Sequence, residues 1–265
     1  MTYIEQVVDW FQKRFADPAK VGVGDLDLGL RVLGVWKSRA LVAEFEHHHG
    51  LTILQGPFAG MAYVGAATEG ALLPRLIGTY EQELHPAIAA FAADPPDCVI
   101  DVGCAEGYYA VGLARLMPSV EVHARDTDPK ALVACQDLAE RNGVSDRVKI
   151  GGLFTPNDFE TFTGRRCLVV CDIEGAEDDL LRPDLAPALA GMSLIVESHE
   201  VYRPGLTARL IERFEPTHDI ERLDMGPRTL PLPTWFDRKN HIDRLIAVWE
   251  WRAGPTPWLV MRPKG

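Results

Sequence analysis

The stretch CVIDVGCAEGYYAVGLA, which runs from Cys98 to Ala114, decides the fold. It opens with a short apolar run, which is typical of a buried strand, and continues as an amphipathic segment that is typical of a helix. Gly103 and Gly107 lie between the two, where glycine permits positive φ and lets a ligand approach the backbone. A strand, a tight turn and a helix in this order predict a βα unit of a parallel sheet.

The chain beyond this unit repeats the alternation of short apolar runs and amphipathic segments. One helix is expected over residues 129–142, because it begins with a proline behind Asp128, which can cap it, and ends at Asn142 and Gly143. Near the C-terminus, THDIERLD and PWLVMRP are expected to be two more strands that flank a helix. The sequence therefore predicts an α/β fold with a doubly wound, mostly parallel, seven-stranded sheet. We expect the first five strands over residues 98–103, 120–126, 148–152, 167–173 and 192–198.

The part of the chain before the DPP break at residues 94–96 has a different pattern. Apolar residues from Ile4 to Phe15 recur at helical spacing, and a second helix is expected from about Tyr80 to Phe91. Between them, LTILQGPFAGMAYVG is broken by glycine and proline and is expected to be extended chain and turns. We therefore predict a mainly helical N-terminal annex over residues 1–95 and a core over residues 96–265.

Composition and charge exclude several classes of protein. The 265 residues include 27 Lys plus Arg and 38 Asp plus Glu, a net charge of −11, so a generally basic surface for nucleic acid is excluded, although a local basic groove is not. The apolar runs are far shorter than the roughly 20 residues that a membrane helix needs, and the N-terminus does not resemble a signal peptide. We therefore expect a cytoplasmic protein without a membrane span. Five cysteines without a CxxC pair predict buried thiols rather than disulfides or a zinc site.

The loop after the first predicted strand indicates the kind of cofactor. Its spacing is Gly-x-Ala-x-Gly rather than the Gly-x-Gly-x-x-Gly of dinucleotide sites. Asp101 stands directly before the turn and Glu106 stands within it. Two carboxylates beside a pyrophosphate would be unfavourable, whereas beside a sulfonium or an ammonium group they are attractive. The loop therefore favours S-adenosylmethionine over a nicotinamide dinucleotide, with a degenerate empty site as the further alternative.

The second predicted strand ends at Asp126, where an acidic side chain can accept hydrogen bonds from ribose hydroxyls. Together, VIDVGCAEGYYAVGLA, ARDTDPKAL and the Asn-Gly-Val helix end resemble the class I S-adenosylmethionine-dependent methyltransferases. Ala105 departs from that pattern, because it stands in the place of the family's middle glycine. The resemblance implies a Rossmann-like core that binds the cofactor through Asp101, Gly103, Ala105, Glu106, Gly107, Asp126, Thr127 and Phe154.

A second motif, in CLVVCDIEGAEDDLL, resembles the DxEGxE motif of the FkbM-type methyltransferases, which mostly methylate hydroxyls of sugars and natural products. The resemblance covers roughly residues 97–200, with a looser echo in EWRAGPTPWLVMRP. GTYEQELHP is similar to the segment that closes over the cofactor in such proteins, which makes Tyr80 and Glu81 further candidate cofactor contacts. The resemblance implies that the annex over residues 1–95 covers the cofactor, and we expect this annex to select the substrate. The Asn/Asp-Pro-Pro-aromatic tetrapeptide of base and glutamine-amide N-methyltransferases does not follow the fourth predicted strand.

Two mechanisms for activating a hydroxyl remain open. Asp172 can act directly as a general base. Alternatively Asp172, Glu197 and His199 can bind a divalent cation that lowers the pKa of a chelated hydroxyl, with His218 completing the set. Residues 197 and 199 point to the same face if the strand stays extended. These ligand types do not choose among Mg, Mn, Fe and Zn. In the alternative interpretation, Glu174 and Glu177 only begin a helix, and the two histidines are ordinary polar loop residues.

The resulting hypothesis is a methyltransferase that acts on a hydroxyl of a small-molecule acceptor, with Asp172, Glu197 and His199 as its catalytic residues. A homo-oligomer is compatible with it. One alternative is a binding or regulatory protein that keeps the fold and the cofactor pocket, and another is a metal-dependent enzyme that uses the site for other chemistry. EFEHHHG is expected to be a helix end that stops at Gly50, and Trp235 and Trp251 are candidates for the acceptor pocket.

Overall fold

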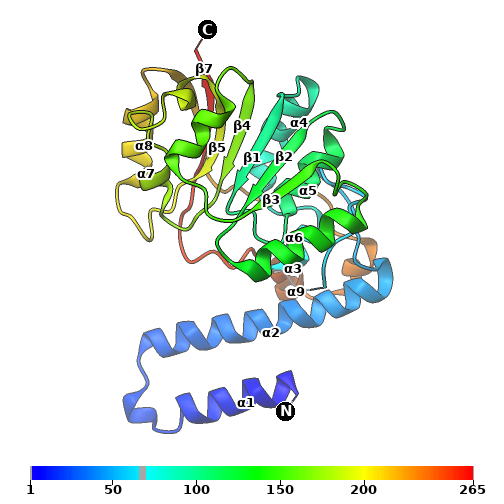
Figure 1. The fold of residues 1–265 in the computed structure, drawn as a ribbon. Coiled ribbons are helices and arrows are strands. Elements are labelled where there is room, and N and C mark those ends of the chain that lie inside the picture. The colour runs from blue at the N-terminus through cyan, green and yellow to red at the C-terminus, as the bar shows by residue number, and fades with distance from the viewer. Residues whose placement is uncertain (1, 66–69, 265) are drawn as a thin grey trace.

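The computed structural model describes residues 2–65 and 70–264, which form an α/β fold around a seven-stranded sheet (Figure 1). The strand order is β3-β2-β1-β4-β5-β7-β6. β7 is antiparallel to both of its neighbours, and the other six strands run in one direction. The predicted fold class is confirmed. The strands are β1 (Cys98–Val102), β2 (Glu121–Arg125), β3 (Val148–Gly151), β4 (Cys167–Cys171), β5 (Ser193–Glu197), β6 (His218–Leu223) and β7 (Trp258–Pro263).

Both faces of the sheet are covered, which is why its central strands β1 and β4 are buried throughout and, apart from Asp101 of β1, apolar. Successive side chains of a strand point to opposite faces, so Val99 belongs to one apolar core and Ile100 to the other. Three helices cover the first face: α4 (His85–Ala93), α5 (Tyr108–Leu116) and α6 (Pro129–Arg141). The second face is covered by α7 (Glu177–Leu180) and α8 (Leu206–Phe214).

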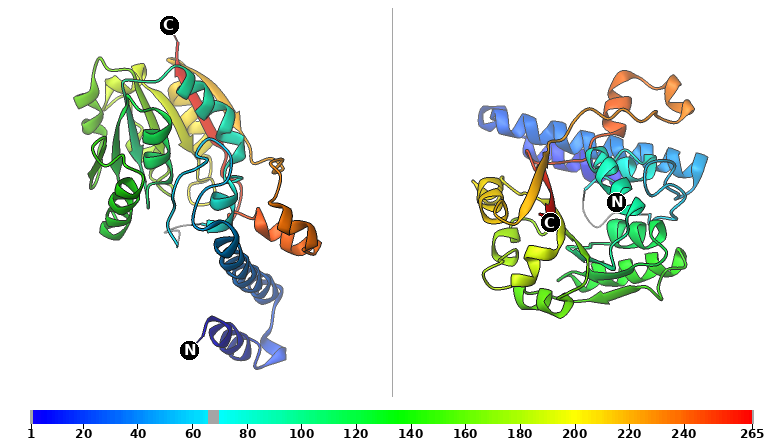
Figure 2. Two further views of the ribbon diagram at one scale, coloured as in Figure 1. Left: turned by 90° about the vertical axis from the view of Figure 1, so that its right-hand side faces the viewer. Right: turned by 90° about the horizontal axis from the view of Figure 1, so that it is seen from above.

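The residues before β1 include a helical region, as predicted. α1 (Tyr3–Arg14) and the first half of α2 (Val23–His49) form an arm that projects from the body of the molecule (Figures 1 and 2). The second half of α2 packs against α9 (His241–Ala247), and α3 (Leu72–Ile77) is fully buried. Only the C-terminal end of α2 was predicted, because the apolar residues of the helix are spread around it to meet different partners and therefore show no single stripe.

Some predicted boundaries differ from the structure. The helix expected from about Tyr80 begins only at His85, because Glu81 adopts a left-handed conformation with φ of 47° and a short 3-10 turn follows. Pro86 in the first turn then suits the start of α4. α6 begins behind Asp128, whose side chain accepts from the Lys130 N–H at 2.9 Å, so the predicted cap is confirmed.

Three smaller predictions are also tested. The five cysteines are free and buried, as predicted. α2 ends at His49 and is followed by Gly50 with φ of 65°, so the expected helix end is confirmed. None of the helices in the described ranges is both long and apolar enough to cross a membrane.

Candidate active site

Two cavities open at the carboxyl-terminal edge of the parallel strands. The larger, of about 470 Å³, lies against the ends of β1, β2 and β4. The smaller, of about 200 Å³, lies between the glycine loop, the end of β5 and the chain that precedes β7. Both cavities are lined by Gly103, Asp172 and Glu174. The two cavities therefore meet at the ends of the two central strands, which is where open α/β sheets bind ligands.

The glycine loop has the close approach that its sequence predicts. Gly103 has φ of 85°, and a Cβ at this position would lie 1.6 Å from the carbonyl oxygen of Asp172. Gly107 has φ of 96°, and a Cβ there would lie 2.8 Å from Sγ of Cys135. Ala105 adopts φ of 45° although it carries a Cβ. The backbone at Ala105 thus has the left-handed conformation that glycine adopts most easily, so the departure from the family pattern leaves the shape of the loop intact.

Asp126 joins this loop to the larger cavity. Its Oδ2 accepts from the Ala105 N–H at 2.9 Å, and its Oδ1 accepts from the Asp128 N–H at 2.8 Å. Thr127 and Phe154 line the same cavity. The structure therefore brings these three predicted cofactor contacts together.

Asp101 lines the smaller cavity at the end of β1 and is almost fully buried. Its Oδ2 has no hydrogen-bond partner in the described part of the chain. Burial, with a smaller contribution from the nearby Asp126, raises the pKa of this carboxyl to about 7. A cationic ligand group in the cavity would compensate this buried oxygen.

Glu106 also lines the smaller cavity, but its charge is compensated within the protein. Its Oε1 accepts from Nη1 of Arg75 at 3.1 Å and from the hydroxyl of Tyr63 at 2.5 Å. Both partners belong to the N-terminal region, so Glu106 links the glycine loop to that region. Glu106, which was predicted to contact the cofactor, therefore holds the glycine loop to the N-terminal region through Arg75 and Tyr63.

The structure separates Tyr80 from Glu81. Tyr80 lines the smaller cavity, where the guanidinium of Arg75 lies 4.3 Å from its ring centroid. Glu81 points elsewhere, because its carboxylate accepts from Arg252 Nη2 at 2.9 Å and from the Tyr109 hydroxyl. Burial raises the pKa of Glu81 to about 8 although Arg252 lowers it. Glu81 supports the wall of the cavity from behind.

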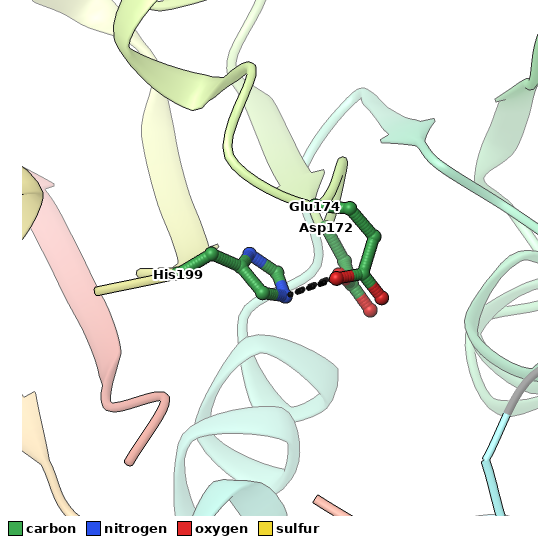
Figure 3. A group of neighbouring side chains, drawn as sticks. All are labelled: Asp172, Glu174 and His199. Carbon is green, nitrogen blue, oxygen red and sulfur yellow. Dashed lines mark ion pairs between the residues drawn. The ribbon is translucent and has the colours of Figure 1, made fainter. Parts of the chain in front are cut away.

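A histidine that lines the smaller cavity, His199, is surrounded by carboxylates, and Figure 3 shows it beside Asp172 and Glu174. Nδ1 of His199 lies 2.7 Å from Oε1 of Glu177. Its Nε2 lies 3.3 Å from Glu174 Oε2, 3.4 Å from Glu197 Oε2 and 3.5 Å from Asp172 Oδ1. One ligand atom each from Asp172, Glu174 and His199 lie within 4.8 Å of one another. The structure thus brings together the three predicted catalytic residues and adds Glu174 and Glu177.

Glu177 holds His199 in a defined orientation. It is fully buried, and its Oε1 also accepts from the N–H groups of Ile173 at 3.2 Å and Gly175 at 3.3 Å. Because a carboxylate only accepts, Nδ1 of His199 is the donor in their contact. Nε2 is therefore directed at the other three carboxylates. An imidazole held by a carboxylate on its far nitrogen is the usual arrangement of a metal-binding histidine.

The electrostatics of this group favour a cation. Burial alone would lower the pKa of His199, but the carboxylates of Glu177, Glu197 and Glu174 raise it above its ordinary value. Burial, together with Glu197, raises the pKa of Asp172 well above its ordinary value. Asp172 Oδ1 is buried and accepts no hydrogen bond from a described residue. A divalent cation would relieve both the clustered negative charge and this orphaned oxygen.

His218 does not complete the set, so that prediction is wrong. It begins β6, and its Nε2 lies 2.8 Å from the carbonyl oxygen of Met192, the residue before β5. Because β6 and β5 run in the same direction, His218 lies at the amino-terminal edge of the sheet, opposite the cavities. Sequence position alone could not reveal this, since it depends on β7 lying antiparallel between those strands.

The sequence analysis assigned no role to Arg252, which contacts three carboxylates. Its guanidinium donates to Glu81, to Glu250 at 3.0 Å and to the predicted catalytic residue Glu197. Its neighbour Trp251 lines the smaller cavity, and the carbonyl oxygen of Trp251 accepts from Arg31 Nη2 at 2.5 Å. The partners of Arg252 are dispersed along the chain, so no local pattern reveals them. The other candidate for the acceptor pocket, Trp235, instead donates to His49 at 3.1 Å.

Comparisons with known proteins give partial matches. No family model matches the chain. The ribosomal protein L11 methyltransferase of Stenotrophomonas maltophilia (strain R551-3) is 33% identical over 121 residues, which are 46% of this chain and 37% of that protein. The release factor glutamine methyltransferase of Geobacter sulfurreducens is 27% identical over 161 residues, which are 58% of this chain and 55% of that protein. The chain thus spans about half or less of the length of these curated relatives.

Among solved structures, a putative O-methyltransferase from Klebsiella pneumoniae is similar with a TM-score of 0.48 and 13% identity, over 86% of this chain and 90% of that one. The O-methyltransferase from Bacillus cereus in complex with SAH has a TM-score of 0.47 and 12% identity, over the same shares of the two chains. The sheet topology, the glycine loop and the sequence matches to curated methyltransferases identify the fold as that of class I S-adenosylmethionine-dependent methyltransferases.

Proposed function

We propose that this protein is an S-adenosylmethionine-dependent methyltransferase that acts on a hydroxyl of a small molecule, such as a sugar or a secondary metabolite. One observation carries the proposal: the two cavities share Asp172, so a cofactor in one would face the acid–base groups that line the other. The match between DIEGAE and the FkbM-type motif supports an oxygen acceptor and a place near that family.

The cofactor is assigned to the larger cavity and to the adjoining part of the smaller cavity that the glycine loop and Asp101 line. Asp126 and Thr127 would bind the ribose, Phe154 would pack on the base, and Asp101 would bind the ammonium group. S-adenosylmethionine supplies an electrophilic methyl group: the acceptor oxygen forms a bond to the methyl carbon, the carbon–sulfur bond breaks, and sulfur keeps the electron pair. The protein's task is to hold the acceptor in line with that bond and to remove its proton.

Asp172 is the proposed proton acceptor. Its pKa is raised by burial and by Glu197, which makes its carboxylate a stronger base than an exposed aspartate. The hydroxyl proton would pass to Asp172 and from there to solvent. His199, held by Glu177, would orient the hydroxyl through Nε2. Glu197 shares its carboxylate between His199 and Arg252, so its role is to position these two side chains.

The same residues fit a divalent metal ion. Asp172, Glu174 and His199 would be its ligands, and Glu177 would orient the histidine. A bound divalent cation would lower the pKa of a coordinated hydroxyl. The ligand set of two carboxylates and one imidazole is compatible with Mg, Mn, Fe and Zn. Relative to the predicted ligand set, Glu174 replaces His218, and Glu197 is left out because its carboxylate accepts from Arg252.

The acceptors named for the curated relatives, a ribosomal protein and a release factor, are not assigned to this chain. The segment after β4 reads DIEGAE and lacks the Pro-Pro-aromatic element of the glutamine-amide enzymes. The smaller cavity is partly walled by Arg31, Arg75 and Tyr80 from the N-terminal region. This placement supports residues 1–95 as the annex that covers the cofactor and selects the acceptor.

The proposal is tested with methyl-labelled S-adenosylmethionine and a panel of sugars, polyols and phenols, with and without Mg²⁺ or Mn²⁺. We expect label in at least one hydroxyl acceptor, loss of transfer in Asp172→Asn and normal transfer in the control Asp219→Asn, an exposed carboxylate of β6. Turnover that survives exhaustive chelation would exclude the metal ion while leaving Asp172 as the base. Binding of NAD in place of S-adenosylmethionine would contradict the proposal.

A further inference from the structure

The arm formed by α1 and the first half of α2 has an incomplete core of its own. No residue of α1, which is described throughout, is buried. α1 is held to α2 by Phe11, whose ring lies 3.2 Å from the Cβ position of Gly29, and by an ion pair between Arg14 and Asp25. Two helices that bury so little are stabilised mainly by packing against further elements.

One face of the arm is apolar and exposed. Val23, Leu26, Leu30 and Leu33 follow one another at spacings of three, four and three residues, which places them on one stripe of α2. Their exposed fractions lie between 45% and 76%. An apolar stripe with this spacing is the seam by which one helix packs against another.

α1 extends this face. The two helices are antiparallel, because Arg14 contacts Asp25 whereas Tyr3 lies near the other end, under Arg39. In an antiparallel pair of helices, a residue that directly follows a contact residue in the sequence points to the same side of the pair, whichever helix it belongs to. Leu26 and Leu30 follow Asp25 and Gly29 in this way, and Ile4 follows Tyr3. The face therefore consists of Ile4, Val8, Val23, Leu26, Leu30 and Leu33, of which the two α1 residues are 61% and 48% exposed.

The distribution of charge indicates what can approach this face. Residues 2–33 contain five acidic and four basic residues, a net charge of −1, so −10 of the total of −11 lies outside the arm. A nearly neutral arm has no electrostatic attraction for anionic lipid or nucleic acid. For a second copy of this acidic chain, the nearly neutral arm is a region that meets little electrostatic repulsion.

The stripe is also compatible with pairing to itself. If two copies of α2 lie antiparallel about a two-fold axis, the apolar residues of one stripe meet those of the other. Such a contact uses the same patch on both subunits, as most soluble homodimers do. Arg31 takes no part in this contact, because its guanidinium bonds the carbonyl oxygen of Trp251 and lies over the ring of Trp249 in its own subunit.

We propose that this apolar face docks against the same face of a second copy, so that the two arms form an antiparallel four-helix bundle. The bundle completes the core that each arm lacks. Arg31 lines the smaller cavity and bonds to Trp251, so dimerisation would also fix the helix that walls one side of the candidate active site.

The experiment is sedimentation velocity and light scattering of the full chain over a range of concentrations. We expect the wild type to have twice the chain mass of 29.3 kDa, and Leu30→Glu and Leu33→Glu to have the mass of a single chain. The matched control is Val133→Glu on α6, a residue of similar exposure at 63%, which should remain a dimer. Circular dichroism and the melting temperature show whether each variant is folded.

Two results would overturn the proposal. The first is a wild type that stays monomeric at every concentration, and the second is a dimer that persists in both leucine variants. Cosedimentation with phosphatidylserine vesicles tests whether the apolar face binds a lipid membrane instead of a second copy. A monomeric wild type that binds vesicles through Leu30 would assign the arm to a membrane surface and would likewise contradict dimerisation.

Discussion

The two cavities at the edge of the sheet differ in how far apart in the sequence their lining residues are. The larger is walled by residues between Val102 and Leu180, at the ends of β1, β2, β3 and β4. The smaller takes its walls from positions as distant as Arg31 and Thr256, brought together by the N-terminal region and the chain before β7. Local motifs therefore suffice to find a cofactor site, whereas the acceptor site exists only after the chain has folded.

The largest effect is expected where the two cavities meet. Gly103→Ala places a Cβ 1.6 Å from the carbonyl oxygen of Asp172 and forces alanine into φ of 85°. We expect the free energy of unfolding to fall by about 4 kcal/mol or more, because backbone rather than a flexible side chain blocks the position. Thermal and urea denaturation measure this loss.

The control for this variant is Gly152→Ala, since a Cβ at Gly152 meets no atom within 4 Å. It should change stability by less than about 1 kcal/mol. Equal destabilisation of the two variants would show that the glycine loop is not the tightly packed junction described above.

The second effect separates the roles of the two cavities. Asp172→Asn should lower the rate of methyl transfer by about 10²–10⁴-fold, the usual contribution of a general base, because the amide cannot take the hydroxyl proton. The affinity for S-adenosylhomocysteine should change little. Steady-state kinetics and titration calorimetry on the same preparation measure the two quantities, and a variant that keeps its turnover would remove Asp172 from the chemistry.

A smaller effect concerns pH. Burial raises the pKa of Asp101 to about 7, so the unliganded protein favours the protonated carboxyl and loses stability from this group as the pH rises through that value. A cofactor ammonium group favours the ionised form instead. The dissociation constant for S-adenosylhomocysteine should therefore fall about tenfold from about one unit below to about one unit above this pKa.

Asp101→Asn should bind more weakly and lose most of that pH dependence, while the exposed variant Asp219→Asn should retain it. Titration calorimetry at several pH values makes the comparison. If affinity in the wild type does not change with pH, Asp101 does not contact a cationic group of the ligand.

The smallest effect is expected at Ala105. Replacing it with glycine relieves the cost of φ of 45° for a residue with a Cβ, but increases the freedom of the unfolded chain. The two changes oppose each other, so Ala105→Gly should alter the free energy of unfolding by no more than about 1 kcal/mol and leave cofactor affinity unchanged. A large gain in affinity would mean that alanine distorts the loop.

The parts of the fold that the sequence predicted correctly are those in which local pattern and tertiary environment agree. The βα units follow from buried strands and amphipathic helices, and the caps of α6 follow from Asp128 and the Asn-Gly pair. The body of α2, unlike its end at Gly50, was not predicted, because its apolar residues serve three different contacts, with α1, with α9 and, as proposed, with a second copy. Periodicity detects a helix with one buried face and misses a helix with several.

The site shows the same limit. Asp101, Asp126 and Asp172 were predictable because each ends a strand of the parallel sheet, and His199 lies two residues beyond the end of β5. His218 was misplaced because the position of β7 between β5 and β6 cannot be read from spacing. The partnership of Arg252 with Glu81, Glu197 and Glu250 depends on chain segments that meet only in the folded protein.

The central claim is that the larger cavity, the glycine loop and Asp101 hold the cofactor, while Asp172 serves an acceptor in the rest of the smaller cavity. Titration calorimetry of S-adenosylhomocysteine against the wild type, Asp126→Asn and Asp172→Asn tests it most directly. We predict binding to one site in the wild type, an affinity about tenfold lower in Asp126→Asn because its hydrogen bonds to the loop and to the ribose are weakened, and a nearly unchanged affinity in Asp172→Asn. No binding to the wild type, or equal losses in the two variants, would contradict the claim.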